Sequence, residues 1–552
     1  MTKTWYSEYD EGVETDINFN EFKNLAEFFE HCFEIYKDRP AFHNMGRTTT
    51  YKKVRDSSNQ LANYLTKNLG LKKGDRVAIM MPNCHQYTIC LFACIKAGLV
   101  TVNVNPLYTP RELQFQLQDS GSKAIFIFEN AMKTLETCFS KTPVVHVICT
   151  KLGDSLPFPK SAILNFVIKY VKKMVPPWKL SHVIWFNDIL KGQPKTFEIP
   201  HISKESTAFL QYTGGTTGIS KGAILTHNNV MSNILQTKAW FGHILDKNGE
   251  ININPLPLCH IFSLVAICFL SISSGSLNIL ITNPRDIKTF IGILRKWKFT
   301  SISAVNTLYK KMMEHPDFNK IDFSHLKMCC SGGMATEEVV AERWEQLTGK
   351  VLLEGYGLTE CSPVVLFNPL GAKSFSGKTG LPVPCSDVQI RNDQGQETPL
   401  GDVGEICVHG PHVMKGYWNH EEETKNAFYD DGYLKTGDMG FMDEKGYVKI
   451  VDRKKDMIIV SGFNVYPTEI ENVVTKNHKV FEAAAIGIPD ETTGEAIKLF
   501  VVKHDDDLTE KELIDYCREN LTNYKIPKII EFSTEELPKT PVGKILRREL
   551  KG

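Results

Sequence analysis

The sequence has no excess of charge of either sign. Lysine plus arginine and aspartate plus glutamate each number 64 among its 552 residues, so the formal net charge is zero. Without a net positive charge the chain has no bulk electrostatic attraction for nucleic acid, and we expect no nucleic-acid partner. The length exceeds what one hydrophobic core supports, so we expect two or more domains.

Signals for export and for a structural metal are absent as well. None of the 14 cysteines forms a C-x-x-C pair, and no histidine and cysteine cluster has the spacing of a zinc site. Met1 is followed by acidic, polar sequence and not by the apolar core of a signal peptide. We therefore expect the cysteines to be reduced thiols of a cytoplasmic protein.

Long uninterrupted hydrophobic runs are also missing. Residues 261–282 come nearest to one, but serine, glycine and asparagine side chains interrupt them. A buried helix followed by a buried strand is the better interpretation, and a transmembrane span is not expected.

Residues 163–175 have the pattern of an amphipathic helix that ends at Pro176-Pro177. One arc carries polar side chains and the other carries apolar ones, from Ile163, Leu164, Val167, Tyr170, Val171 and Met174. The favoured interpretation is a surface helix that packs on the core. The alternative is a helix at a membrane surface, with lysines of the polar arc (Asn165, Lys169, Lys172, Lys173) meeting anionic headgroups.

The rest of the pattern predicts an α/β protein. Short β-branched runs at 76–81, 123–128 and 144–149 alternate with helical patterns at 56–69 and 111–117. A similar alternation resumes from 209 to about 354. Between 382 and 451 short strands and frequent turns predict a small antiparallel barrel, and a compact α+β pattern follows to the end.

The two common nucleotide signatures, a Walker A loop and G-x-G-x-x-G, do not occur in the most glycine-rich segment. Residues 212–222 instead read YTGGTTGISKG, and the nine positions 213–221 hold three glycines, three threonines and Lys221. Glycines free the backbone for close approach, and amides, hydroxyls and an ammonium group together attract a polyphosphate. A flexible surface loop is the alternative.

Four further segments carry polar groups suited to a nucleotide. Residues 354–360 (EGYGLTE) combine an aromatic ring, glycines and a carboxylate that suits Mg²⁺. Residues 432–438 end in Asp438, which can accept hydrogen bonds from ribose hydroxyls. Residues 452–456 (DRKKD) and 541–548 (PVGKILRR) offer an arginine and a lysine. Alternatively, 354–360 and 432–438 are structural turns, 452–456 is a solvated hinge, and Lys544 of 541–548 is a surface lysine.

In this order and spacing, the five segments resemble the adenylate-forming superfamily of acyl-CoA synthetases, luciferases and peptide-synthetase adenylation domains. More narrowly, the whole chain is similar to the bacterial long-chain fatty acid–CoA ligases. The segments that carry this likeness are 102–113, 210–218, 281–286, 353–360, 431–455 and 450–467.

The resemblance implies a two-step reaction. A carboxylate attacks the α-phosphate of ATP to give an acyl-adenylate and pyrophosphate, and coenzyme A then attacks the acyl carbonyl and expels AMP. It also implies an N-terminal AMP-binding domain of two α/β subdomains and a β-barrel, residues 1–451. A mobile α+β domain, residues 452–552, would carry Lys544.

The resemblance further implies roles for residues of this sequence. Lys544 would bridge the acyl carboxylate and the α-phosphate, and Thr213 and Glu360 would hold Mg²⁺ and complete the catalytic set. His260 would lie beside the acyl carboxylate, and Ser461 and Gly462 would meet coenzyme A. The ATP and AMP contacts would be Thr213, Gly214, Gly215, Thr216, Thr217, Gly218, Lys221, Gly332, Gly333, Glu354, Gly355, Tyr356, Gly357, Thr359, Asp438, Arg453 and the hinge residue Lys455.

Two positions depart from the family pattern, and the substrate stays open. Cys259 replaces the usual aromatic residue before His260, and Ile459 replaces a lysine found in some relatives. The alternatives are a ligase for medium-chain or aryl acids, a fatty acyl-AMP ligase, and a nucleotide-binding membrane scaffold with a dead site. We expect a cytoplasmic protein in peripheral contact with the inner face of a membrane; a homodimer is left open.

Overall fold

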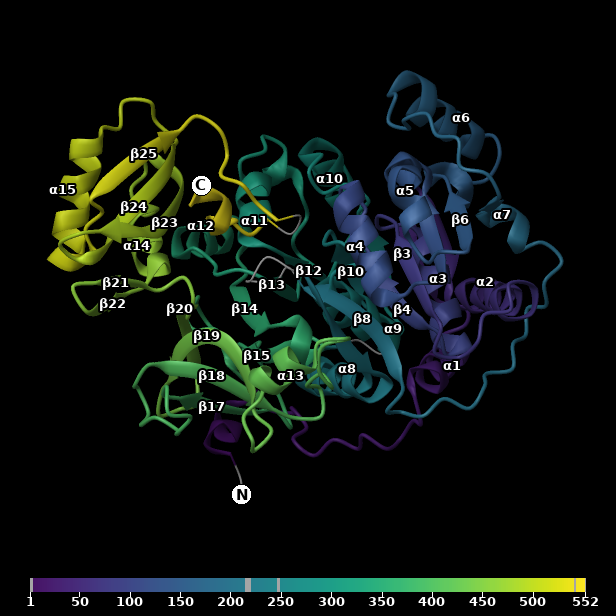
Figure 1. Ribbon diagram of the computed structural model, residues 1–552, viewed down its shortest axis with the longest axis horizontal. Helices are drawn as coiled ribbons and strands as arrows, with labels where there is room; N and C mark the ends of the chain where they lie inside the picture. The colour runs from purple at the N-terminus through teal and green to yellow at the C-terminus, as the bar shows by residue number, and fades with distance from the viewer. Residues whose placement is uncertain (1–2, 214–219, 246–248, 541–542, 552) are drawn as a thin grey trace.

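The computed structural model describes residues 3–213, 220–245, 249–540 and 543–551, which form four sheets with helices packed around them (Figure 1). The first sheet has seven strands in the order β7-β6-β5-β3-β4-β8-β9, parallel except for β9. Its strands are β3 (Arg76–Met80), β4 (Val100–Asn103), β5 (Ala124–Phe128), β6 (His146–Thr150), β7 (Val183–Trp185), β8 (Thr207–Thr213) and β9 (Lys221–Thr226).

The strands predicted at 76–81, 123–128 and 144–149 are therefore confirmed as β3, β5 and β6. The predicted helices are confirmed too, although their ends differ by several residues. Residues 56–69 form the end of α2 and a π-helical turn at Tyr64–Asn68, and 111–117 lie within α4, which Thr109 begins with a capping box. The helices here are α2 (Tyr51–Asn63), α3 (His85–Ala97), α4 (Pro110–Ser120), α5 (Met132–Cys138), α6 (Lys160–Phe166) and α7 (Phe186–Ile189).

The second sheet has nine strands in the order β16-β15-β14-β13-β12-β10-β11-β1-β2, and its central strands are parallel. The strands are β1 (Pro40–Asn44), β2 (Arg47–Thr50), β10 (Ile251–Asn254), β11 (Leu277–Leu280), β12 (Ser301–Ala304), β13 (Met328–Ser331), β14 (Leu352–Gly357), β15 (Val364–Phe367) and β16 (Leu381–Pro382). The helices are α1 (Leu25–Ile35), α8 (His227–Phe241), α9 (Leu270–Ser273), α10 (Ile287–Leu294), α11 (Asn306–Met313) and α12 (Glu338–Thr348).

Residues 261–282 form a buried helix and a buried strand, as predicted. A π-helical segment, Phe262–Phe269, continues into α9 and is followed by β11. Among the residues that the structure describes, no helix is long and apolar enough to cross a membrane.

The third sheet is antiparallel, in the order β17-β18-β19-β20. It consists of β17 (Asp387–Arg391), β18 (Gly404–His409), β19 (Leu434–Met442) and β20 (Val448–Arg453), with α13 (Glu421–Ala427) beside it. The small barrel predicted here is not closed by a β17–β20 ladder among the described residues. The outer edge of β20 is occupied instead, because Val448 exchanges backbone hydrogen bonds with Thr379 and Gly380.

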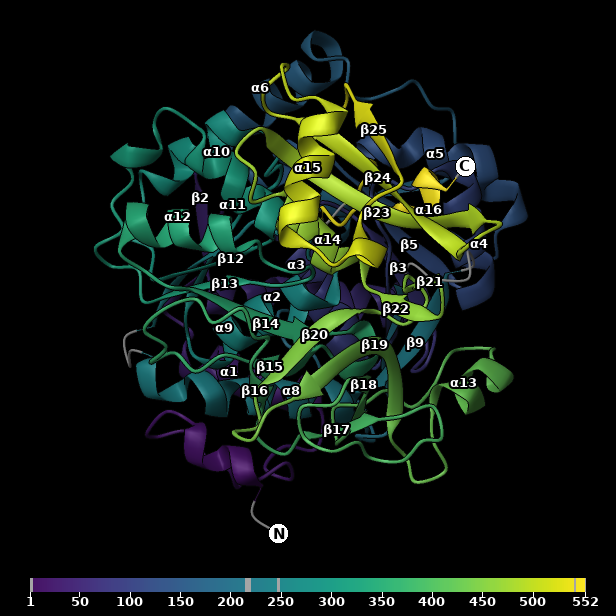
Figure 2. The ribbon, with the colours of Figure 1, turned by 90° about the vertical axis from the view of Figure 1, so that its left-hand side faces the viewer.

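The C-terminal region has the predicted α+β composition and lies beside α11 and α12 (Figures 1 and 2). Its sheet runs β22-β21-β24-β23, and β25 pairs with β24. The elements are β21 (Ile458–Val460), β22 (Phe463–Val465), α14 (Pro467–Val474), β23 (Val480–Asp490), β24 (Gly494–Lys503), α15 (Glu510–Asn520), β25 (Ile529–Ser533) and α16 (Arg547–Leu550).

The helix predicted at 163–175 exists as α6 and a π-helical turn, Val167–Val171, but its expected packing on the core is wrong. No residue of 158–175 belongs to a hydrophobic core cluster of the described chain. The polar residues Asn165 and Lys169 face the protein, where they bond to Gly153 and Glu129. Local hydrogen bonds, and not burial of the apolar arc, fix how this helix lies.

Arg547 joins the last helix to the junction between the two regions. Its guanidinium donates two hydrogen bonds to Glu471 of α14, of 3.0 and 2.7 Å, and reaches Asp452 and Asp456 at 3.5 and 3.3 Å. The Asp452 side chain is only 2% exposed. A buried carboxylate that loses its partner retains its desolvation cost, so these groups depend on Arg547.

We expect Arg547→Met to destabilise the C-terminal region by about 3 kcal/mol, because Glu471 and Asp452 would stay buried without their cation. Hydrogen exchange of the β23 amides in the full chain would measure this. As a matched control, Arg518→Met removes a surface pair with Asp515 and should cost less than about 0.5 kcal/mol. Equal, small effects of both substitutions would contradict the expectation.

Candidate nucleotide and acyl site

Two strands carry the ends of the glycine-rich segment. Thr213 closes β8, Lys221 opens β9, and the two residues are direct partners in the antiparallel ladder. Gly214, Gly215, Thr216, Thr217 and Gly218, which were predicted to bind phosphate, lie outside the described residues. The ladder nevertheless holds the Thr213 hydroxyl and the Lys221 ammonium group at the same end of the sheet.

Tyr417 links Glu360 to this end of the sheet. The Tyr417 hydroxyl donates a 2.8 Å hydrogen bond to the Glu360 carboxylate, and the Lys221 ammonium lies 5.3 Å from the centre of the Tyr417 ring. Burial raises the pKa of Glu360, and the Tyr417 hydrogen bond opposes that rise. A cation bound near this carboxylate would favour its ionised form.

Asp438 is the best-connected polar group of the site. Its carboxylate accepts a 2.6 Å hydrogen bond from the Tyr356 hydroxyl and pairs at 3.2 Å with Nε of Arg453. The side chain is buried, and the charge of Asp438 raises the pKa of Arg453. Each carboxylate oxygen has a second lone pair that remains suited to a ribose hydroxyl.

Backbone crowding explains the glycines predicted to line the adenine. A Cβ at Gly355 would lie 2.6 Å from the Phe367 ring, and one at Gly357 would lie 2.0 Å from the Pro363 carbonyl oxygen. A Cβ at Gly332 would lie 3.2 Å from the Gly355 carbonyl oxygen, and Gly333 has a φ of +79°, which favours glycine. The close packing of the chain itself around β14 therefore requires glycine at positions 355 and 357.

Glu354 and Thr359 complete this edge. The Glu354 carboxylate accepts a 2.9 Å hydrogen bond from the Thr336 backbone, and burial raises its pKa to about 7. A carboxyl group that is partly protonated near neutral pH can both donate and accept. Thr359 begins the short turn that also carries Glu360.

Lys544 reaches this site from the C-terminal region. A Cβ at the preceding residue, Gly543, would lie 2.7 Å from the Thr307 hydroxyl, so the loop inserts tightly beside α11. Burial lowers the pKa of Lys544 to about 8; the charge of Arg453 lowers it further, and that of Asp438 raises it. The predicted catalytic lysine and the predicted ribose aspartate are therefore neighbours.

His260 lies at the start of the buried helix. Burial lowers its pKa to about 4, so the imidazole is neutral at physiological pH. The Cys259 carbonyl accepts a hydrogen bond from Gln211, so the backbone at this departure from the family pattern is fixed.

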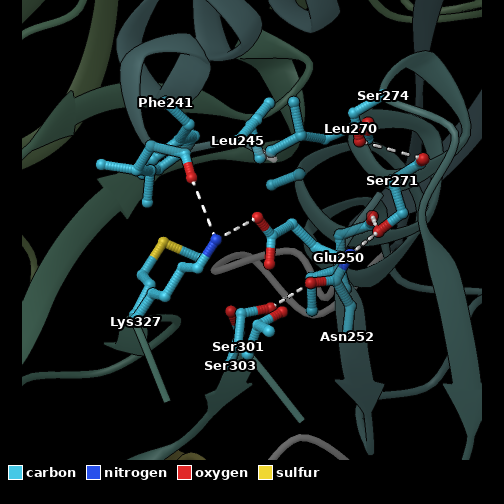
Figure 3. A pocket seen from close by; sticks show the side chains of 15 residues that line it. Phe241, Leu245, Glu250, Asn252, Leu270, Ser271, Ser274, Ser301, Ser303 and Lys327 are labelled. Atoms are coloured by element: carbon cyan, nitrogen blue, oxygen red, sulfur yellow. Dashed lines mark hydrogen bonds and ion pairs between the residues drawn. The ribbon is translucent and has the colours of Figure 1, made fainter. Parts of the chain in front are cut away.

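A pocket follows the second half of the same helix, between it and β12 (Figure 3). A Glu250–Lys327 ion pair of 2.6 Å and hydrogen bonds among Asn252, Ser271 and Ser301 line one side. The apolar lining comes from Phe241, Ile244, Leu245, Ala266, Ile267 and Leu270. Ser303 of β12 belongs to the lining, whereas Ile261, Leu264 and Val265, earlier in the same helix, lie in the core.

Ser461 and Gly462 do not join the site in this arrangement. They form the two-residue turn between β21 and β22, both with positive φ, and they are exposed. Such a turn favours glycine for its own sake. Lys455 is likewise exposed, next to Asp456 at the junction.

Tyr417 and Thr336 were not predicted from the sequence. Tyr417 lies 57 residues from Glu360 and Thr336 lies 18 from Glu354, and neither is part of a glycine-rich or charged segment. Only the fold brings these partners together, so no local signal could have identified them.

The residues at this site fit a magnesium nucleotide. Among the described residues no group of three or more histidine, cysteine, aspartate or glutamate side chains is arranged to hold a metal. Mg²⁺ is usually bound by one or two carboxylates together with substrate phosphates, so Glu360 alone is compatible with it. The site combines cationic groups, a carboxylate suited to the ion and a second, buried carboxylate at Asp438.

Comparisons with known proteins agree with this geometry. Residues 29–418 match the family model described as AMP-binding enzyme, and residues 469–544 match AMP-binding enzyme C-terminal domain. ATP-bound MatB from Rhodopseudomonas palustris superposes with a TM-score of 0.83 at 27% identity, covering 96% of this chain and 98% of that one. The apo form of the same protein, with the same coverage and identity, gives 0.73.

The sequence similarity extends over the full length. A long-chain-fatty-acid–CoA ligase of Yersinia pestis is 51% identical over 552 residues, which covers all of this chain and 98% of that protein. The predicted adenylate-forming fold and the resemblance to long-chain fatty acid–CoA ligases are thereby confirmed. The chain belongs to the AMP-binding enzyme family.

Proposed function

We propose that the chain uses ATP and coenzyme A to convert a long-chain fatty acid into acyl-CoA through an acyl-adenylate, with release of pyrophosphate and AMP. The observation that carries this proposal is the loop of Lys544, which inserts beside Thr307 and brings the lysine close enough to Asp438 and Arg453 for their charges to act on it. A cation from the C-terminal region would thus approach the ribose end of a bound nucleotide. Identity of 51% over the full length to a long-chain ligase supports the acyl class.

The nucleotide would be held by groups from three strand ends. Thr213, Lys221 and the amides of 214–218 would contact the β- and γ-phosphates, and Thr359 would add a hydroxyl. Tyr356 would stack on adenine against Gly332, Gly333, Gly355 and Gly357, with Glu354 at its edge. Asp438, supported by Arg453, would accept the ribose hydroxyls.

Thr213 and Glu360 would hold Mg²⁺. The ion would neutralise phosphate charge, which otherwise repels the acyl carboxylate. Tyr417 keeps the Glu360 carboxylate aimed and, through its ring, places Lys221 nearby.

Lys544 would lie between the acyl carboxylate and the α-phosphate, where it would stabilise the charge that develops during attack. His260 is neutral and would add no positive charge, so it would orient the carboxylate by hydrogen bonding. The acyl chain would run along the helix that begins at Phe262 toward the pocket of Figure 3.

Thioester formation would require another arrangement of the C-terminal region relative to residues 1–451. The higher score against ATP-bound than against apo MatB supports an adenylation-like arrangement here. We propose that the C-terminal region, residues 452–552, rotates about Lys455 relative to residues 1–451. Ser461 and Gly462, now exposed, would then face the adenylate and admit the pantetheine arm.

We also propose a cytoplasmic protein that works at the inner face of a membrane, where long-chain acids partition. Medium-chain or aryl acids, transfer of the adenylate to a carrier protein, and a dead site on a membrane scaffold remain alternatives that assays can separate. A homodimer remains one candidate for the assembly.

Acid-dependent ATP–pyrophosphate exchange, measured across saturated acids from C6 to C18 and with coumarate, tests the proposal. We expect an optimum between C12 and C18 and AMP release that depends on coenzyme A. An optimum at short-chain or aryl acids would contradict the long-chain substrate and indicate one of those classes instead. Exchange without coenzyme A consumption would indicate an acyl-AMP ligase, and no exchange with any acid would favour the scaffold.

Lys544→Ala should lower exchange about 100-fold or more, because the transition state loses a preorganised charge, while thioester formation from supplied acyl-AMP is largely kept. Gly462→Asn should keep ATP–pyrophosphate exchange and lower thioester formation, since asparagine tolerates the turn but its side chain would obstruct the pantetheine arm. Gly401→Asn, at another open glycine with positive φ, is the control. Equal loss of both half-reactions in Lys544→Ala would contradict its role.

The same lysine predicts the pH dependence. Its pKa of about 8 is below the ordinary value, so the free enzyme loses this positive charge as pH rises through about 8. We expect kcat/KM for ATP in the exchange reaction to fall over that range. In Lys544→Arg the guanidinium stays protonated, and the alkaline fall should disappear whatever the absolute rate.

Tyr417→Phe should raise the Mg²⁺ concentration needed for half-maximal exchange about tenfold, because Glu360 loses a hydrogen bond to its charged form. Mn²⁺ titration followed by electron paramagnetic resonance, with a non-hydrolysable ATP analogue, should show a similar weakening. Tyr433→Phe removes a comparable tyrosine–Asp387 contact outside the site and is the control. Unchanged metal dependence in Tyr417→Phe would refute the positioning role.

A further inference from the structure

An exposed apolar surface on and around α6 has no counterpart elsewhere in the described chain. Six of the 17 large hydrophobic side chains that are exposed fall within residues 158–174, and each is more than half exposed. Three are aromatic. We call this set the α6 face: Phe158, Ile163, Phe166, Tyr170, Val171 and Met174.

The outward direction of this face is built into the local structure. Oδ1 of Asn165 accepts a 2.8 Å hydrogen bond from the Gly153 backbone, and its Nδ2 donates to Asp154 at 3.2 Å. Lys169 pairs with the buried Glu129 at 3.1 Å. A Cβ at Gly153 would lie 2.6 Å from Oδ1 of Asn165, so glycine is needed for this approach. Asn165 and Lys169 of the polar arc are therefore held against the protein.

The charge within and next to this helix is positive along the sequence. Residues 155–187 contain five lysines and no aspartate or glutamate. Lys160, Lys172 and Lys173 are exposed at the ends of the helix. From a neighbouring element, Asp286 at the start of α10 lies close enough to Lys172 to feel its charge, and Lys288 accompanies it. An apolar strip with aromatic residues and flanking lysines is typical of helices that lie in a lipid interface.

The position of α6 suits contact with a flat surface. In both ribbon views the helix lies at the outer edge of the molecule, away from the third sheet (Figures 1 and 2). Its close neighbour is the short turn Leu152–Ser155. Pro176 and Pro177 follow directly.

We propose that the α6 face docks the protein on an anionic lipid bilayer. Insertion of the six apolar side chains at the headgroup boundary would remove them from water, and Lys160, Lys172 and Lys173 would meet lipid phosphates. A second copy fits less well, because a two-fold pairing of this face would bring the lysines of both copies together. This docking proposal is argued from the exposure, hydrogen bonds and charges of the α6 face. Only the idea that docking delivers the acyl substrate from the membrane rests on the proposed function.

Vesicle flotation of the full-length chain tests the proposal, with phosphatidylcholine vesicles that contain about 30 mol % phosphatidylglycerol. We expect the triple variant Ile163→Asp/Phe166→Asp/Tyr170→Asp to lower the partition coefficient at least tenfold. Because these side chains lie outside the core, its melting temperature should be unchanged. The control Leu400→Asp/Val403→Asp/Ile529→Asp alters three exposed apolar residues elsewhere and should stay within twofold of the unaltered chain.

Charge and insertion are tested separately. Lys172→Gln/Lys173→Gln should weaken binding to the anionic vesicles about fivefold per lysine and leave binding to pure phosphatidylcholine unchanged. Brominated lipid should quench the added fluorescence of Tyr170→Trp more than that of Leu400→Trp. Equal quenching would overturn insertion at this face.

Exchange with hexanoate, a water-soluble acid, separates this proposal from the proposed function. The triple variant should keep the exchange rate of the unaltered chain; if neither shows exchange, vesicle binding can still be measured. Unchanged flotation of the triple variant would overturn the proposal. So would analytical ultracentrifugation that shows a dimer dissociated by these substitutions without any effect of vesicles.

Discussion

Asp438 is the group on which the arrangement of the site depends. It is a buried carboxylate at which two separate segments meet, Tyr356 at the end of β14 and Arg453 at the end of β20. A buried charge must be paired or hydrogen-bonded, because its desolvation is otherwise too costly. The need to satisfy Asp438 therefore ties the second sheet to the third, and its negative charge also acts on Lys544 of the C-terminal loop.

Arg547 extends the same logic to the junction. It lies three residues after Lys544 and pairs with Glu471, Asp452 and Asp456, so the loop that carries Lys544 is anchored from both sides. Asp452 also accepts a hydrogen bond from the Thr468 backbone. A rotation about Lys455 would leave the Arg547–Glu471 and Arg547–Asp456 pairs intact, because these residues lie on the same side of the hinge. Only the contacts of Asp452, which precedes Lys455, would have to change.

Much of this was predictable because it is local. The strands at 76–81, 123–128 and 144–149 follow from short β-branched runs, and the proposal that 354–360 binds a nucleotide comes from the types of residue that occur together there. The contacts of the Tyr417 hydroxyl with Glu360 and of the Thr336 backbone N–H with Glu354 were not predictable, since a donor distant in sequence leaves no pattern near its partner. Turn spacing likewise predicted the strands between 382 and 451, but it does not show which strand edges meet, and Val448 of β20 bonds to Thr379 and Gly380 from another segment.

The helix at 163–175 shows most clearly what apolar periodicity cannot predict. The spacing of apolar residues separates a polar arc from an apolar arc, yet that spacing is the same when the helix is turned half a revolution about its axis. Burial usually decides the orientation, since apolar area removed from water is worth about 25 cal/mol per Å². Here Asn165, held by Gly153 and Asp154, and Lys169, held by Glu129, decide it instead. Exposure of the apolar arc to water then remains unfavourable in free energy. Contact of these side chains with the apolar interior of a bilayer would remove that cost.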